Sequence, residues 1–145
     1  FMDLALEEAK AAATRGEVPV GALLVDGKTG EILARAGNRT EEESDPTAHA
    51  EMLVIREAAA KKGQTRLAGC DLYVTLEPCP MCAAAISFAR IRRLYFGAYD
   101  PKGGGVEHGP KFFGHATCHH QPEVVGGVNE RDASMLLKSF FMGRR

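Results

Sequence analysis

The sequence predicts one α/β domain in which a central sheet lies between helices on both faces. At 145 residues, the chain (1–145) has the length of a single domain. Its apolar residues switch repeatedly between helical and strand spacing, with glycine and proline at the breaks. Because helical and strand segments alternate along the chain, we expect a three-layer α-β-α arrangement.

The first part of the chain predicts a helix followed by a β-hairpin. Residues 2–15 carry apolar side chains at helical spacing among charged ones, and Gly16 provides a stop. Residues 18–25 form a dense β-type run, and residues 31–36 alternate as a second strand. The turn signal Asp26-Gly27 between them favours an antiparallel hairpin.

An exposed polar loop then leads to a helix, a buried strand and a second helix. The first helix should begin near Thr47 or Ala48, since Pro46 suits a helix start, and it should end at Gly63. Residues 71–76 are apolar enough for a buried strand, and residues 80–89 form a short helix with proline in its first turn.

The last third of the chain adds strands, a loop and a terminal helix. Residues 92–98 predict a strand, and three glycines at 103–105 mark a loop. We expect one short helical turn at 111–114, a short strand at 123–128, and a helix over 130–142.

Composition and charge exclude several classes of protein. The hydrophobic fraction is 45% and the charged fraction 26%, as in ordinary globular proteins. A net charge of −1 argues against a non-specific nucleic-acid coat protein. No apolar run approaches the length of a membrane span, and no secretory signal is visible. The chain opens on Phe1, so we expect the initiator and a few residues to precede it.

Two short motifs carry the chemistry, His49-x-Glu51 and Cys79-x-x-Cys82, each at the start of a predicted helix. Together they form the pattern of zinc-dependent base deaminases. His49, Cys79 and Cys82 supply three ligands and leave a fourth tetrahedral position open, which is typical of catalytic zinc. A metal in this position lowers the pKa of a water molecule, and Glu51 is placed to move its proton.

Interpretations other than a catalytic zinc site stay open for the same residues at this point. Cys79 and Cys82 could form a redox pair. A closed structural zinc site could draw its fourth ligand from Cys118, His119 or His120. Glu51 could be an ordinary carboxylate on a helix face, and Cys70 and Cys118 are expected to be small packing residues.

The chain resembles the bacterial tRNA-specific adenosine deaminases of the cytidine/deoxycytidylate deaminase superfamily. The resemblance covers nearly the whole chain. It rests on the segments E-V-P-V-G-A at 17–22, G-N-R at 37–39, D-P-T-A-H-A-E at 45–51, L-Y-V-T-L-E-P-C-x-M-C-A at 72–83, R-I-R-R-L-Y-F-G-A at 90–98, D-P-K-G-G at 100–104 and S-F-F-M-G-R-R at 139–145. It implies a cytidine-deaminase-like fold with a mixed five-stranded sheet, one Zn²⁺ per subunit, and a homodimer.

The resemblance also implies a function and a set of substrate contacts. The expected reaction is hydrolytic deamination of adenosine to inosine at the wobble position of an arginine tRNA, in the cytoplasm, with the anticodon stem-loop as partner. Glu51 would shuttle the proton, and Asn38 and the Ala50 N–H would face the flipped base. The pocket walls and RNA contacts would come from Val18, Leu76, Asp100, Lys102, Phe140, Phe141 and Arg144.

The C-terminal segment combines two phenylalanines with two arginines. Phe140 and Phe141 are consecutive, so they point about 100° apart on a helix. Beside Arg144 and Arg145 they suit base stacking and phosphate contact.

His108 stands where many family members have serine, which puts the role of that position in doubt. His119 and His120 partly match paired histidines of the family.

Two other functions compete with this interpretation. Guanine deaminases of the same superfamily share T-A-H-A-E and can show P-C-P-M-C, as this chain does at 47–51 and 78–82. The D-P-K-G-G loop and the F-F…R-R end favour the RNA enzyme. A zinc-stabilised RNA-binding module without activity would not need Glu51.

Overall fold

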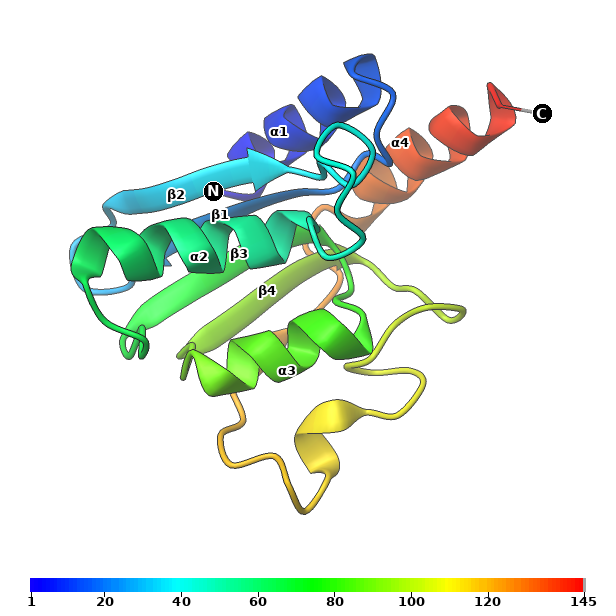
Figure 1. Ribbon diagram of the computed structural model, residues 1–145. Coiled ribbons are helices and arrows are strands. Elements are labelled where there is room, and N and C mark those ends of the chain that lie inside the picture. Colours follow the sequence, from blue (N-terminus) through cyan, green and yellow to red (C-terminus); the bar gives the residue numbers. More distant parts are fainter. Residues whose placement is uncertain (145) are drawn as a thin grey trace.

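Five strands form one mixed sheet in the computed structural model, which describes residues 1–144 (Figure 1). The spatial order is β2-β1-β3-β4-β5, with β1 antiparallel to both β2 and β3. The pairs β3–β4 and β4–β5 are parallel. The strands are β1 (Gly21–Asp26), β2 (Ile32–Gly37), β3 (Cys70–Leu76), β4 (Arg93–Ala98) and β5 (Glu123–Val125). The expected mixed five-stranded sheet is confirmed.

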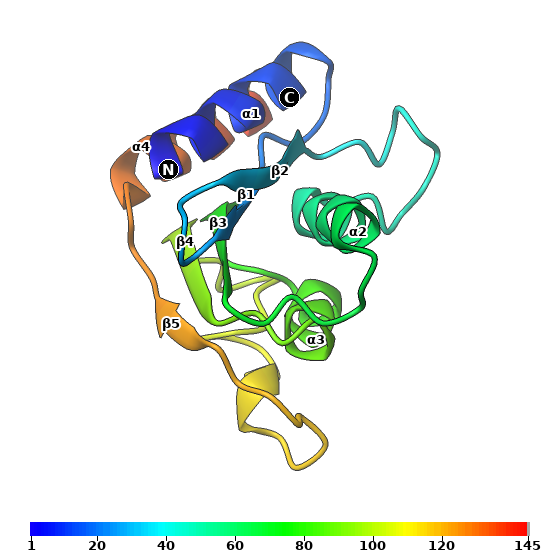
Figure 2. The same cartoon turned by 90° about the vertical axis from the view of Figure 1, so that its left-hand side faces the viewer.

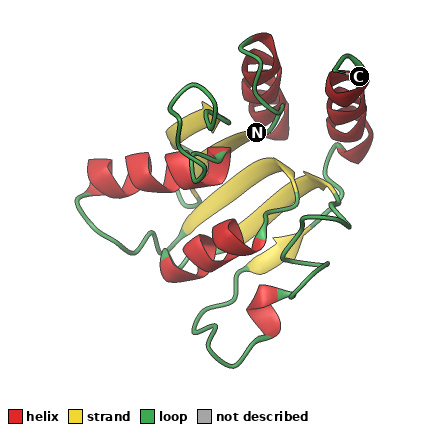
Figure 3. Cartoon of the chain, turned by 45° about the vertical axis from the view of Figure 1, so that its right-hand side comes forward, coloured by secondary structure: helices red, strands yellow, loops and turns green. Residues whose placement is uncertain are grey.

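The helices cover both faces of this sheet, as expected (Figures 2 and 3). One face carries α1 and α4, and the other carries α2 and α3. The helices are α1 (Met2–Thr14), α2 (Ala50–Lys62), α3 (Pro80–Phe88) and α4 (Glu130–Met142), with a 3₁₀ turn at Phe112–Gly114.

The strand β1 shows why its sequence is apolar throughout. Leu24 belongs to the core beneath α2 and α3, whereas Leu23 and Val25 belong to the core beneath α1. Successive side chains of a strand point to opposite faces, so a strand covered on both faces needs apolar residues at every position. Gly21 allows α1 to approach closely, because a Cβ there would lie 2.0 Å from the Ala5 carbonyl oxygen.

Three element boundaries differ from the sequence prediction by more than one residue. The first strand begins at Gly21 rather than at residue 18, since Pro19 has no N–H for the ladder and the Val20 N–H turns back to the Val18 carbonyl. The last strand ends at Val125, where Gly126 and Gly127 follow.

The helix α2 begins at Ala50, two to three residues after the predicted start. The Asp45 carboxylate accepts hydrogen bonds from both the N–H and the hydroxyl of Thr47, which holds residues 45–47 in a local turn. His49 therefore becomes the N-cap residue of α2, in an extended conformation with φ −72° and ψ 148°.

The topology gathers the candidate residues at one end of the sheet. The first turns of α2 and α3, the loop before α2 and the loop after β4 lie on the same side of the molecule (Figure 1). No helix within residues 1–144 combines the length and the apolar character that a bilayer crossing needs.

Candidate metal centre and substrate pocket

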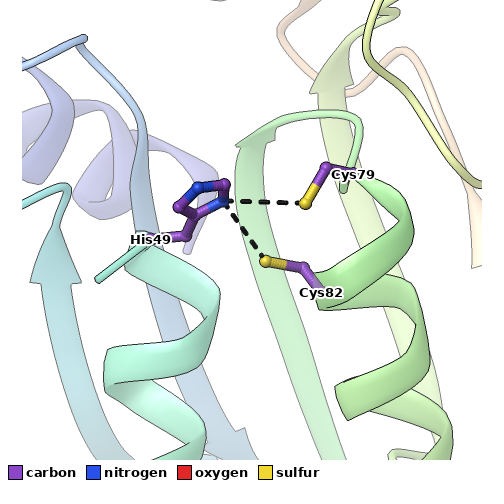
Figure 4. Close-up of side chains that lie close together, drawn as sticks. All are labelled: His49, Cys79 and Cys82. Atoms are coloured by element: carbon purple, nitrogen blue, oxygen red, sulfur yellow. Dashed lines mark hydrogen bonds between the residues drawn. The ribbon is translucent and has the colours of Figure 1, made fainter. Parts of the chain in front are cut away.

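His49, Cys79 and Cys82 converge at the first turns of two helices (Figure 4). His49 is the N-cap of α2, Cys79 is the N-cap of α3, and Cys82 lies in the first turn of α3. The His49 Nδ1 atom lies 3.7 Å from Cys79 Sγ and 3.5 Å from Cys82 Sγ. Within residues 1–144, no other group of His, Cys, Asp and Glu side chains lies close enough together to hold one metal ion.

The spacing of these ligand atoms fits zinc. Tetrahedral zinc with bonds of about 2.3 Å to sulfur and about 2.0 Å to nitrogen separates the two atoms by about 3.5 Å. The measured separations of 3.5 and 3.7 Å match that value. Two sulfurs and one imidazole nitrogen are also the ligand types that zinc prefers.

None of the residues considered as a fourth ligand groups with the three side chains. The Cys118 thiol donates to the His120 carbonyl oxygen, and its sulfur lies 3.4 Å from the Ser87 hydroxyl. The His120 Nε2–H donates to the Ile91 carbonyl oxygen at 2.7 Å, which is a structural role. His119 is exposed. The cysteines are free thiols, so the described chain offers three protein ligands and an open fourth position.

The pKa values of the two cysteine thiols shift in opposite directions when no metal is bound. Contact with Cys82, followed by contact with His49, lowers the pKa of Cys79 to about 4. The neighbouring Cys79 sulfur and burial raise the pKa of Cys82. The hydrogen bond with Cys79 raises the pKa of His49. The three side chains thus share protons that a metal ion must displace when it binds.

Glu51 lies in the first turn of α2 beside this cluster, and only 4% of the residue is exposed. Burial is the main cause that raises the pKa of Glu51 to about 7. A carboxyl group with a pKa near neutrality can both accept and release a proton. The structure therefore places a carboxyl group that can transfer protons next to the three ligands.

A pocket of about 300 Å³ opens over the cluster. This volume lies at the small end of ligand sites, which range over about 300–1,000 Å³. Val18 and Leu76, which were expected to form walls, do line it. The full lining is Val18, Val20, Asn38, Thr40, His49, Glu51, Leu76, Glu77, Cys79, Asp100 and Gly103.

Asn38 and Ala50 contact each other rather than facing the pocket independently. The Asn38 Oδ1 atom accepts a buried hydrogen bond of 2.8 Å from the Ala50 N–H. Asn38 thereby supplies the cap that the His49 side chain does not give to α2. Asn38 also lines the pocket, and its NH₂ group can still donate, because the bond to Ala50 uses only the amide oxygen. Contact of the Ala50 N–H with a base stays a prediction.

A second hollow of about 510 Å³ adjoins the pocket and shares Val18, Leu76 and Asp100 with it. Lys102 and Phe141 also line this hollow, and the Phe141 ring is 55% exposed. The Asp100 carboxylate accepts N–H groups of Lys102 and Gly103, which fixes the turn at the rim of both cavities.

Residues 1–98 match the family described as the cytidine and deoxycytidylate deaminase zinc-binding region. A tRNA-specific adenosine deaminase of Agrobacterium fabrum is 60% identical over 145 residues, which are 100% of this chain and 94% of the relative. The chain belongs to the family of tRNA-specific adenosine deaminases. The metal of the cluster is therefore zinc, as its geometry indicated.

Solved structures with a similar fold include a tRNA deaminase and a guanine deaminase. A structure from work on A-to-I editing by tRNA:A34 deaminases at the wobble position has a TM-score of 0.92 and 61% identity, covering 94% of this chain and 98% of the other. A guanine deaminase of Bacillus subtilis has a TM-score of 0.64 and 39% identity, covering 68% of this chain and 62% of the other. The cytidine-deaminase-like fold is confirmed.

The aromatic residues near the C-terminus contact each other and a neighbouring arginine. The rings of Phe140 and Phe141 meet edge to face, with centroids 5.3 Å apart. The Arg144 guanidinium lies 4.1 Å from the centre of the Phe140 ring, a cation–π contact. Arg145 lies outside the described residues. Neither phenylalanine is buried, and Phe141 lines the second hollow.

Sequence reasoning missed two buried glutamates that support the pocket loops. Glu17 accepts hydrogen bonds from the Glu41 and Glu42 N–H groups, and Glu77 accepts them from the loop after β4. Burial raises the pKa of each carboxyl, but these hydrogen bonds outweigh it and leave both pKa values below normal. Glu77 stood in the E-P-C segment, yet its sequence position alone carried no sign of burial.

Replacing Cys82 by serine should abolish stoichiometric zinc binding, because one of three protein ligands becomes a poor zinc donor. The matched control is Cys118→Ser, which removes a sulfur that does not face the cluster. Metal analysis of the purified proteins should give about one zinc per chain for the control, and far less for Cys82→Ser. Equal zinc loss in both variants would contradict the three-ligand site.

Proposed function

We propose that this chain deaminates adenosine to inosine at the wobble position of a tRNA, with arginine tRNA as the substrate. One observation carries the proposal: a single small pocket is lined by the zinc ligands His49 and Cys79, by Glu51 and by Asn38. The kinship with tRNA-specific adenosine deaminases over the whole chain supports it.

The second hollow favours RNA over a free base as substrate. A free purine needs only the pocket of about 300 Å³, whereas a nucleotide within a loop needs room for its neighbours. The adjoining hollow offers such room, with the Lys102 ammonium for phosphate and the exposed Phe141 ring for stacking. An anticodon loop suits this site, because its unpaired bases can be extruded at low cost.

The side chains divide the chemistry between recognition and proton transfer. Zinc, when bound, supplies a Lewis acid that makes hydroxide available from water near neutral pH. Asn38 donates from its NH₂ group to the purine, while Val18 and Leu76 contact its faces. Glu51 moves two protons in turn: one from the attacking water to the ring nitrogen, and then one from the added hydroxyl group to the departing amine. Adenosine and water thus yield inosine and ammonia.

We also infer that the chain acts in the cytoplasm as a homodimer. The free thiols suit a reducing compartment. The Phe88 side chain, 72% exposed at the end of α3, offers an apolar contact for a second copy. A solution mass equal to the single chain of 15.6 kDa would contradict the dimer.

The decisive substrate test offers the protein two molecules separately. One is an anticodon stem-loop with adenosine at the wobble position, and the other is guanine. We expect inosine from the first and no xanthine from the second, measured by chromatography of the digested products. Xanthine without inosine would instead favour the guanine deaminase alternative.

Glu51→Gln should keep zinc and lose about 10²- to 10⁴-fold in kcat, which is the usual contribution of a general acid–base group. The control is Glu57→Gln, which makes the same change on the exposed face of the same helix. Single-turnover kinetics on the stem-loop should show near-normal rates for the control. A normal rate for Glu51→Gln would exclude its role in proton transfer.

Phe141→Ala should weaken stem-loop binding by about 1–3 kcal/mol, since one base would lose its stacking partner. Arg144→Ala should weaken binding less at high salt than at low salt. The control is Met135→Ala, which truncates another exposed apolar residue of α4. The KM for the stem-loop measures the effect, and a KM unchanged in both variants would remove α4 from the RNA site.

A further inference from the structure

Glu77 lies between the end of β3 and the zinc ligand Cys79, and its side chain is completely buried. Its own N–H donates to the Ala98 carbonyl oxygen, which continues the pairing of β3 with β4. Five donors surround the carboxylate, and all come from residues 100–108. A buried carboxylate with this many donors from one loop is more than a residue that fills space.

The donors divide between the two carboxylate oxygens. The Oε1 atom accepts the Asp100 N–H at 3.0 Å and the His108 Nδ1–H at 2.8 Å. The Oε2 atom accepts three consecutive N–H groups, from Val106 at 3.2 Å, Glu107 at 2.9 Å and His108 at 3.1 Å. The loop therefore wraps around one negative charge from both of its ends.

We propose that Glu77 is a positioning residue, whose carboxylate holds the loop 100–108 at the rim of the substrate pocket. The kinetic part of this proposal rests on the proposed function, whereas the structural part does not.

The path from Glu77 to the pocket is short. Glu77 fixes the Asp100 N–H, and the Asp100 carboxylate in turn accepts the N–H groups of Lys102 and Gly103. Asp100 and Gly103 line the pocket, and Lys102 lines the adjoining hollow. If the loop lost its acceptor, these three residues would lose their fixed place relative to the zinc ligands.

The local sequence is adapted to this carboxylate. A Cβ at Gly104 would lie 2.4 Å from Glu77 Oε2, so only glycine allows the loop to approach so closely. The Gly105 N–H donates to the Pro78 carbonyl oxygen, which ties the loop to the residue that follows Glu77. Gly104 and Gly105 are thus required by close approach, since a Cβ at Gly105 would lie 2.6 Å from the Pro80 nitrogen.

The same arrangement assigns a part to His108. Its ring is the one side chain of the loop that donates to Glu77, and it meets the Tyr99 ring edge to face at 6.2 Å. His108 therefore closes the far end of the loop onto the carboxylate. A donor at the Nδ1 position is what this contact requires.

The test replaces the carboxylate by the amide of the same shape. Glu77→Gln puts an NH₂ group against N–H donors, whichever way the amide turns. The control is Glu107→Gln, which makes the same charge change on the same loop with an exposed side chain. Zinc content, amide hydrogen exchange and stem-loop kinetics are measured for both variants.

We expect Glu77→Gln to keep zinc and to lose exchange protection at the amides of Asp100, Val106, Glu107 and His108. Protection in β1 and β3 should be retained. The KM for the stem-loop should rise about tenfold with little change in kcat, as is typical of a lost binding interaction. Glu107→Gln should match the wild type in all three measurements.

Two variants of His108 keep the proposal testable if Glu77→Gln does not fold. His108→Ala removes one donor and should raise the KM and the exchange at residues 106–108. His108→Asn should restore both, because its amide NH₂ can occupy the place of Nδ1–H.

Three results would overturn the proposal. The first is wild-type exchange protection of the loop in Glu77→Gln. The second is a zinc loss that accounts for the whole loss of activity. The third is a His108→Ala variant that equals the wild type in KM and exchange. If the wild type itself leaves the stem-loop unchanged, the proposed function fails, but the exchange pattern still decides the role of Glu77.

Discussion

The placement of zinc ligands at helix N-caps is the constraint on which the rest of the site depends. His49 and Cys79 both adopt the extended conformation of an N-cap, and neither side chain caps its helix. Each helix must therefore satisfy its first N–H groups in another way. In α2 the distant Asn38 accepts the Ala50 N–H, whereas in α3 Pro80 has no N–H to satisfy. The side chain that caps α2 also lines the pocket, and it is the one that we propose contacts the base, so the metal site and the pocket share a residue.

Two buried carboxylates organise the loops around this centre. Glu17 holds the loop that precedes α2, and Glu77 holds the loop that follows β4. In both cases hydrogen bonds from loop N–H groups outweigh the cost of burying the carboxylate, as the lowered pKa values indicate. Flexible, polar segments can thereby form the rim of a small pocket without a hydrophobic core of their own. The sheet provides a rigid base, and the two carboxylates extend that order into the loops.

The sequence was sufficient to predict the layers, the order of the elements and the zinc ligands. These features depend on local periodicity and on a short motif. The sequence was insufficient to predict contacts between a side chain and residues that lie far from it along the chain. The Glu77 contacts with Val106, Glu107 and His108 span about 30 residues, and no local pattern reveals them. The later start of α2 has a local cause, the Asp45 turn, which competes with helix formation. Pro19 should have shortened the first predicted strand, because a proline in a central strand removes a ladder bond.

X-ray absorption at the zinc edge, measured on the protein without substrate, tests the central claim most directly. The open N-cap site predicts two sulfur atoms at about 2.3 Å and two lighter atoms at about 2.0 Å, with imidazole scattering from one histidine only. That pattern leaves the fourth position to solvent, as a hydrolytic site requires. Scattering from a second imidazole or a third sulfur would show a fourth protein ligand, and the account of a catalytic centre would then be wrong.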